Sequence, residues 1–382
     1  MVLDKVVCGR GGTGFSFLLP FFSCIFPRNL LAKKTYSKIE NREKKNVMVS
    51  YIIKRLLHMI PVTLILSFIC FLVIDLAPGD FVSIYQTRIM SMSSQMTQEA
   101  IQAQLEFLDE MRVLYGLDKP ILQRYFTWLF GIVTRGDFGY AYMVMRPVST
   151  IIWEKLGWTL VLTSCSMFFA LLIGFVVGVY AATHQYGVVD YIATFTSYVG
   201  LAIPSFFLAL LLMTMVVFVF QGQVGGLFSA EYVAAPWSWN KLLDLLSHLW
   251  IPVLIVGTAG AASNIRIVRG NLLDVLGQPY VQTARAKGQA ERFVIYRHAL
   301  RNSLHPLIMR IGSSLPSLIA GEIIVSIVLG LPTAGKTFYD ALMYQDTYLA
   351  GSFLVMLAVL LQVGNLLADI ALIRIDPTIS YD

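Results

Sequence analysis

The 382-residue chain is 57% hydrophobic and 14% charged, with a mean hydropathy of +0.68. A typical soluble domain has about a quarter of its residues charged. These values exclude an ordinary soluble enzyme and predict a polytopic membrane protein. The net charge of +6 does not indicate nucleic-acid binding, because the basic residues gather at the start and in one central loop, next to apolar segments.

The four cysteines give no sign of a metal site or a disulfide framework. They are Cys8, Cys24, Cys70 and Cys165, and the last two lie inside apolar segments. Their spacing matches no metal-ligand pattern. We therefore expect no disulfide, no metal and no cofactor.

Residues 1–47 combine a short apolar run, GFSFLLPFFSCIF, with a cationic stretch. The run is too short to span a bilayer comfortably, and no small-residue cleavage site follows it closely. We expect residues 1–47 to be a dispensable tail or a mis-assigned start, with translation effectively beginning at Met48.

Six later segments are apolar and long enough to cross a bilayer. They are expected at about residues 56–77, 158–183, 191–220, 249–267, 307–329 and 349–373. Pro204 interrupts the third segment, where a kink is expected. Gly174 and Gly178 in the second segment, and the run GTAGAASN in the fourth, favour close helix packing.

This pattern divides the chain into five parts. Residues 1–47 are followed by a first transmembrane helix (48–79), an extracytoplasmic helical domain (80–155), a core of five further spans (156–374) and a cytoplasmic C-terminus (375–382). The core contains a long polar loop at 270–304 and a second exported loop at 221–247. The fold class is thus an all-α integral membrane protein with six transmembrane helices.

Charge determines the expected orientation. The loop from 266 to 301 contains only two acidic residues, Asp274 and Glu291, and seven basic ones. The basic residues are Arg266, Arg269, Arg285, Lys287, Arg292, Arg297 and Arg301. Cytoplasmic loops are enriched in such residues, so this loop and both chain termini are expected in the cytoplasm.

The basic loop has helical signals of its own. Pro279 suits a first helical position, and Gly288 suits a left-handed stop, which predicts a short, thin helix over 279–287. A second segment follows, with Phe293, Tyr296, Leu300 and Leu304 spaced as one apolar helix face. By pattern alone, the loop is either a docking element for another protein or a charged loop that only sets topology.

The run RIVRGNLLDVLGQPYVQTARAKGQAERFVIYRHALRNSLHP resembles the cytoplasmic coupling loop of ABC-importer permeases, above all the dipeptide, oligopeptide and nickel permeases. The resemblance extends over residues 48–382. In that family the small-residue element is a coupling helix that docks into a cleft of the ATPase subunit. The resemblance implies ATPase coupling at six residues: Tyr280, Ala284, Arg285, Ala286, Lys287 and Gly288.

The resemblance also implies the fold and the partners. The fold is that of type I ABC-importer permeases, and the chain itself performs no bond chemistry. The expected partners are a second homologous permease subunit, two cytoplasmic ABC ATPase subunits, an extracytoplasmic solute-binding protein and membrane lipid, in a bacterial or archaeal cell membrane. The cargo stays open between dipeptides, oligopeptides, nickel chelates and oligosaccharides.

Four residues are candidates for the translocation pathway. Pro204 and Ser205 lie in the family-like segment GLAIPSFFLALLLM, and Glu322 is an acid within the fifth span, which is costly unless it is partnered or hydrated. The family more often has its acid at the position of Ser326, one turn later on the same face. The alternatives are a packing kink at Pro204, a paired acid at Glu322, or an ion- or proton-driven secondary transporter that uses Glu322 and Asp369 as a relay.

Residues 330–337 match the phosphate-loop pattern G-x-x-x-x-G-K-[ST]. A phosphate loop requires a βαβ unit, whereas both flanking segments here are predicted spans, and the expected topology puts the motif outside the cytoplasm. We read Gly330, Pro332 and Gly335 as a turn after the fifth span. A nucleotide-binding enzyme is the remaining rival interpretation.

Overall fold

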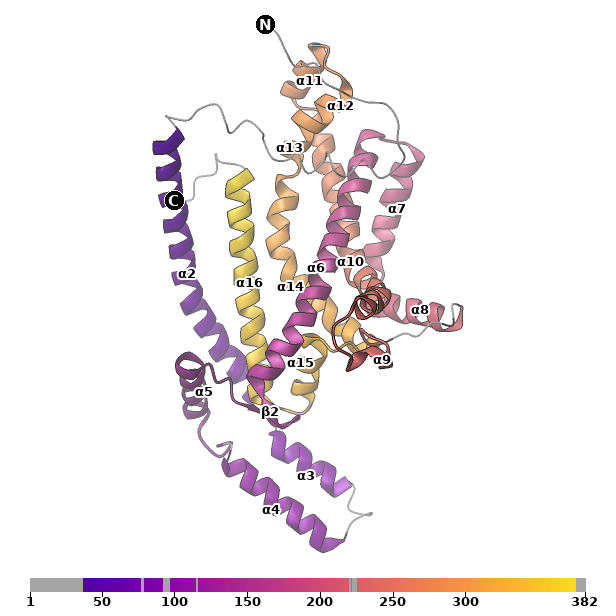
Figure 1. The fold of residues 1–382 in the computed structure, drawn as a ribbon. Helices are drawn as coiled ribbons and strands as arrows, with labels where there is room; N and C mark the ends of the chain where they lie inside the picture. The colour runs from indigo at the N-terminus through magenta and orange to yellow at the C-terminus, as the bar shows by residue number, and fades with distance from the viewer. Residues whose placement is uncertain are drawn as a thin grey trace.

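The computed structural model describes residues 37–76, 79–91, 97–114, 116–219, 221 and 225–375. Five long helices lie side by side and form the body of the molecule (Figure 1). They are α2 (Ser37–Asp75), α6 (Val148–Thr183), α10 (Trp239–Leu276), α14 (His305–Leu329) and α16 (Thr347–Ile375). The helix α2 begins before Met48, so residues 37–47 continue the first long helix. Residues 1–36 and 376–382 lie outside the described part.

Shorter elements cover both ends of this body (Figure 1). At one end are α3 (Phe81–Ser91), α4 (Gln98–Leu114), α5 (Ile121–Arg135), the antiparallel strands β1 (Tyr140–Ala141) and β2 (Arg146–Pro147), and α15 (Ala334–Met343). At the other end are α11 (Pro279–Ala286), α12 (Glu291–Phe293), the π-helical turn η2 (Val294–Ala299) and α13 (Leu300–Ser303). The remaining helices are α7 (Val188–Ala202), α8 (Ser205–Phe218) and α9 (Ala230–Val233).

The helices provide four to six candidate membrane spans. Four segments are long and apolar enough: 50–75, 148–183, 239–276 and 347–367. Two bent pairs, α7 with α8 and the end of α14 with α15, bring the number to six if each pair counts as one span. The helices α6 and α10 contain 36 and 38 residues, so each is roughly 55 Å long. Both are longer than the apolar thickness of a bilayer, which is about 30 Å.

The third predicted span is broken rather than kinked. Helices α7 and α8 meet at an angle of 103°, and Ile203 and Pro204 between them are extended. Proline has no N–H to donate, and it disfavours a helical conformation of the residue before it. After the break, α8 packs across α14 and α10 through Ala209 and Val216. The interruption expected at Pro204 is confirmed, and the bend there is sharper than a kink within one helix.

Helices α6 and α10 pack closely against each other. A Cβ atom added to Gly174 would lie 2.3 Å from the Cβ of Asn264, and one added to Gly178 would lie 2.9 Å from the Cβ of Val268. Asn264 finds its buried partner there, because its Nδ2 donates to the carbonyl of Ala170 at 3.2 Å. The predicted close packing through small residues is confirmed.

We expect Gly174→Ala to destabilise the protein, because the new methyl group overlaps α10. Overpacking of this kind costs about 1–3 kcal/mol. The matched control is Gly157→Ala, in the same helix, where an added Cβ meets nothing within 4 Å. That change should stabilise by about 0.5 kcal/mol. Thermal unfolding of the purified variants in detergent measures both, and equal effects at the two positions would contradict the packing argument.

Asp346 joins the β-hairpin to the start of α16. Its side chain is fully buried and accepts hydrogen bonds from the backbone N–H groups of Met143, at 3.1 Å, and Leu349, at 3.2 Å. Burial raises the pKa of the Asp346 carboxyl from 3.8 to about 6, although these N–H groups favour its charged form. The junction therefore contains an acid whose pKa is raised to about 6.

A raised folded-state pKa stabilises the fold below the unfolded pKa, and this contribution is lost as pH rises through about 6. The difference between the ordinary and the raised pKa of Asp346 corresponds to a change in the free energy of unfolding on the order of 3 kcal/mol. We expect the melting temperature of Asp346→Asn to depend less on pH, between pH 4 and 7, than that of the unaltered protein. Asp118→Asn, which removes an exposed acid, should keep the original slope. Equal slopes for Asp346→Asn and the unaltered protein would refute the assignment.

Candidate functional site

Residues 277–304, here called the coupling segment, follow directly from the end of α10 (Figure 1). Helix α11 begins with Pro279 in its first turn and ends at Ala286. Gly288 then adopts a left-handed conformation with φ +72°, and its N–H donates to the carbonyl of Arg285 at 2.9 Å. The predicted short helix and its glycine stop are confirmed.

One face of the coupling segment is buried against the ends of α6 and α10. The buried residues on the segment are Val281, Ala284, Val294, Ala299 and Leu300, and they pack on Val179, Ala182, Val268 and Leu272. Ala284 faces this cluster and so is not exposed to a partner. Tyr280, Ala286, Lys287 and Gly288 are exposed.

Polar contacts brace the segment internally. Arg285 pairs with Glu291 at 2.7 Å and also donates to the carbonyl of Leu276 at 3.4 Å. The hydrogen bonds from Arg285 hold the pKa of Glu291 below its usual value. The Tyr280 hydroxyl accepts a hydrogen bond from Asn302 at 2.9 Å. Arg285 and Tyr280 therefore hold the two halves of the segment together.

The second half of the segment differs from the predicted apolar face. Phe293 and Tyr296 are 45% and 42% exposed, whereas Val294 and Ala299 are fully buried. The reason is η2, because a π-helical turn has a wider spacing than the 3.6 residues on which the prediction depended. Arg297 lies over the Phe293 ring, 5.5 Å from its centre. The exposed surface of the segment thus contains aromatic and basic groups.

Glu322 and Ser326 lie together on α14, facing α15. Both are fully buried. The Ser326 hydroxyl donates to the carbonyl of Ile323 at 2.9 Å. The Glu322 carboxyl lies beside the hydroxyls of Ser326 and Thr333, but neither of its oxygens has a hydrogen bond of normal geometry to a described residue. The two residues are thus enclosed within the subunit.

Pro204 and Ser205 lie elsewhere, at the break between α7 and α8. Pro204 is exposed and Ser205 is half-buried. The structure therefore divides the four candidate pathway residues into an exposed pair at a helix break and a buried pair beneath α15.

The phosphate-loop pattern does not form a phosphate loop. It follows the helix α14 rather than a strand, and Gly330, with φ +63°, ends that helix. Gly335 is not part of the turn, as had been expected, but lies in α15, where an added Cβ would be 2.7 Å from the Cα of Ile323. The N–H of Ala334 donates to the Thr159 hydroxyl at 2.8 Å. The glycine spacing therefore allows α15 to pack closely on α14.

Asp369 is far from Glu322 along the body. Helices α14 and α16 run in opposite directions (Figure 1), and Glu322 lies about two turns from the end of α14 that leads to α15. Asp369 lies near the other end of the body, where it contacts Arg55 at 2.8 Å and accepts a hydrogen bond from Tyr51 at 2.9 Å. The two acids do not form a relay in this structure.

The sequence analysis missed one ion pair next to the coupling segment. Arg269 on α10 binds Asp190 on α7 through two hydrogen bonds, of 2.5 and 2.9 Å. The two residues are 79 positions apart. In the sequence, Asp190 is recognisable only as an acid in the first turn of a predicted helix. Such acids are too common to indicate a distant ion-pair partner.

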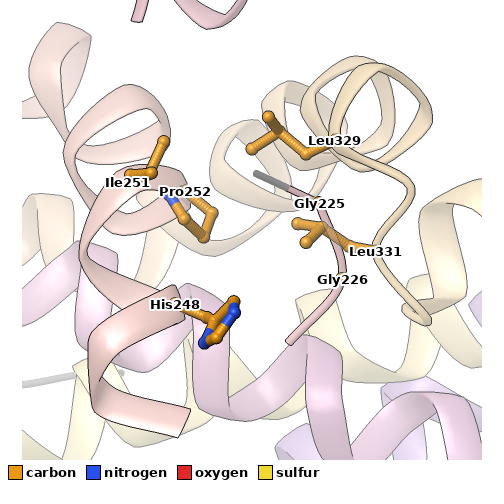
Figure 2. Close-up of a pocket in the computed structure, with 7 residues that line it drawn as sticks. All are labelled: Gly225, Gly226, His248, Ile251, Pro252, Leu329 and Leu331. Atoms are coloured by element: carbon orange, nitrogen blue, oxygen red, sulfur yellow. The ribbon is translucent and has the colours of Figure 1, made fainter. Parts of the chain in front are cut away.

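A small pocket lies where α10 meets the end of α14. Figure 2 shows His248, Ile251 and Pro252 of α10 on one side, and Leu329 and Leu331 on the other. Gly225 and Gly226 lie between these groups, and the N–H of Gly226 donates to the carbonyl of Leu329 at 3.0 Å. The pocket holds about one water molecule, so it is a packing gap and not a solute site.

The cysteines described are free thiols, Cys70 and Cys165, whereas Cys8 and Cys24 lie outside the described residues. Within the described ranges, no cluster of three His, Cys, Asp or Glu side chains is placed to hold a metal ion.

Comparison with protein families identifies the chain. The family described as binding-protein-dependent transport system inner membrane component matches residues 174–381, more than half of the sequence. The chain belongs to this family. The corresponding N-terminal family of these membrane components matches residues 48–163. The resemblance to ABC-importer permeases is thereby confirmed, and the protein is a multi-pass inner-membrane permease component.

Curated relatives of this permease component point to peptide transport. The chain is 38% identical to the oligopeptide transport system permease protein AppB of Bacillus subtilis, and 31% identical to the glutathione transport system permease protein GsiC of Pectobacterium atrosepticum. It is 28% identical to the dipeptide transport system permease protein DppB of Alkalihalophilus pseudofirmus. Each match covers 87% of this chain and the whole of the relative. The chain therefore belongs to the peptide branch of the family.

We expect Lys336→Ala to have little effect on this permease component. Lys336 pairs with Asp340 one turn away at 2.9 Å and is 41% exposed, and such exposed pairs contribute about 0.5 kcal/mol or less. Thermal unfolding should therefore change little. Binding of a fluorescent ATP analogue to the purified chain should be equally weak before and after the change. A clear loss of ATP affinity in the variant would show that the motif binds phosphate.

Proposed function

We propose that this chain is a permease subunit of an ATP-driven ABC importer and forms, with a second homologous permease, the translocation pathway for peptides or a similar small solute. Family membership supports the permease role, and the names of the relatives support the cargo, since oligopeptides, dipeptides and glutathione are all short peptides. The chain performs no bond chemistry, and ATP is hydrolysed by two separate cytoplasmic ATPase subunits.

The observation that carries this proposal is the construction of the coupling segment. Its inner face is buried on α6 and α10, and an ion pair braces it. A loop that only sets topology needs neither feature. The exposed residues Tyr280, Ala286, Lys287 and Gly288 form the surface that enters the ATPase cleft, while Ala284 and Arg285 keep that surface in position.

The proposed topology follows the charge pattern. The coupling segment and both chain termini are cytoplasmic, and residues 80–155 lie outside, where the solute-binding protein delivers its cargo. Figure 1 supports this arrangement, because α11–α13 and α3–α5 lie at opposite ends of the long helices. The span count is six when each bent pair crosses the membrane once.

The pathway itself lies at the break between α7 and α8. Pro204 and Ser205 border it, since a broken helix leaves backbone groups that only protein or water can satisfy. Glu322 and Ser326 do not line the pathway. They lie beneath α15, where they support the contact between α14 and α15.

We expect Gly288→Asp to release the ATPase subunits. Gly288 is left-handed and exposed, so a larger residue imposes a backbone penalty of about 1 kcal/mol or more and adds volume at the docking surface. Membrane insertion should stay normal, because the long helices are untouched. Co-purification of the ATPase subunits in detergent, together with peptide uptake in cells, measures the effect.

The matched control is Gly136→Asp. Gly136 is also exposed, has φ +64° and, like Gly288, would place a Cβ with nothing within 4 Å. It lies after α5, at the opposite end of the molecule, so this variant should keep its ATPase subunits. If Gly288→Asp retained its ATPases and normal uptake, the coupling segment would be only a charged topology loop.

A further inference from the structure

The coupling segment is joined tightly to one end of α10. Only two residues separate α10 from α11, and the buried cluster on Val268 and Leu272 joins the segment to the same helix. A closely packed protein interior is hardly compressible, so it transmits a displacement from one packed element to the next. Any displacement of the segment therefore displaces this end of α10.

Helix α7 is a separate element that lies along α10. Gly200 of α7 is close to Thr258 and Ala262, since an added Cβ would be 3.3 Å from each. Ala193 packs on Ile265 nearby. These contacts are apolar, and the Arg266 guanidinium of α10 lies over the Tyr198 ring of α7, 5.3 Å from its centre. None of them is a directional hydrogen bond, so by themselves they leave α7 free to shift on α10.

The ion pair between Arg269 and Asp190 removes that freedom. Asp190 is 3% exposed, and it also accepts a hydrogen bond from the backbone N–H of Tyr186 at 3.0 Å. Arg269 binds both of its carboxylate oxygens. A two-point contact of this kind has one favourable orientation, and separating it leaves a buried charge without a partner.

We propose that Arg269 and Asp190 are positioning residues that make α7 follow α10 when the ATPase subunits move the coupling segment. The movement then reaches the Pro204 break and α8, which packs across α14. The proposal rests on the proposed function, because it assigns a route between the ATPase contact and the pathway.

The test uses four variants of the full complex: Asp190→Asn, Arg269→Gln, the double variant with both of these changes, and Arg269→Lys. The change Asp190→Asn keeps a side-chain oxygen for the Tyr186 N–H, and the double variant leaves no unpaired buried charge, so it is the one expected to fold normally. A fluorophore is attached to a cysteine that replaces Phe218, which ends α8 and is 79% exposed, after the four natural cysteines are replaced.

In the unaltered complex, addition of ATP and vanadate should change the fluorescence of the probe. In the double variant, the ATPase subunits should remain bound and should hydrolyse ATP at about half or more of the original rate. The response of the probe should fall at least about fivefold, as expected for loss of a coupling contact. The effects of the two single changes should not add, because both remove the same pair. Arg269→Lys, which offers only a point charge, should restore part of the response.

Two results would overturn the proposal. One is a full probe response in the double variant. The other is loss of its ATPase subunits, which would show that the pair holds the segment itself and does not relay its movement. Failure of the proposed function looks different, because the unaltered chain would then co-purify with no ATPase subunits at all.

Discussion

The rest of the structure depends on the close contact between α6 and α10. Glycines on α6 allow the two helices to approach until the backbone of one nearly touches the side chains of the other, as at Gly174 and Asn264. In a bilayer, where lipid is as apolar as leucine, helices associate through such packing together with interhelical hydrogen bonds and lipid entropy. Because both helices are longer than the bilayer is thick, the contact holds a stiff pair that reaches beyond the membrane and carries the coupling segment.

Buried polar groups then define how the other elements join this pair. The hydroxyl of Thr159 on α6 caps the start of α15, and Asp346 ties the β-hairpin to α16. Asp190 ties α7 to α10 in the same way. Each of these groups satisfies backbone or charge where water is scarce, which a membrane protein must do internally. These polar contacts therefore fix the relative orientation of the elements that they join, whereas the apolar contacts around them do not.

The coupling segment is both braced and exposed. In the function proposed for it, transmission of a movement requires a rigid surface, and docking into another protein requires an exposed one. The segment meets the first through its buried face and the pair between Arg285 and Glu291, and the second through its thin helix and left-handed Gly288. The π-helical turn adds the exposed ring of Phe293, so the exposed surface proposed for docking is wider than one helix.

The sequence by itself determined the apolar segments, the basic loop and the short helix from Pro279 to the glycine stop, because hydropathy, proline and left-handed glycine act locally. Its resemblance to permeases predicted a coupling role for the basic loop. Only the tertiary structure decided that Ala284 faces inward, that Gly335 belongs to a helix and that Asp190 binds Arg269 across 79 residues. These features depend on which helix lies opposite, and no local pattern contains that information.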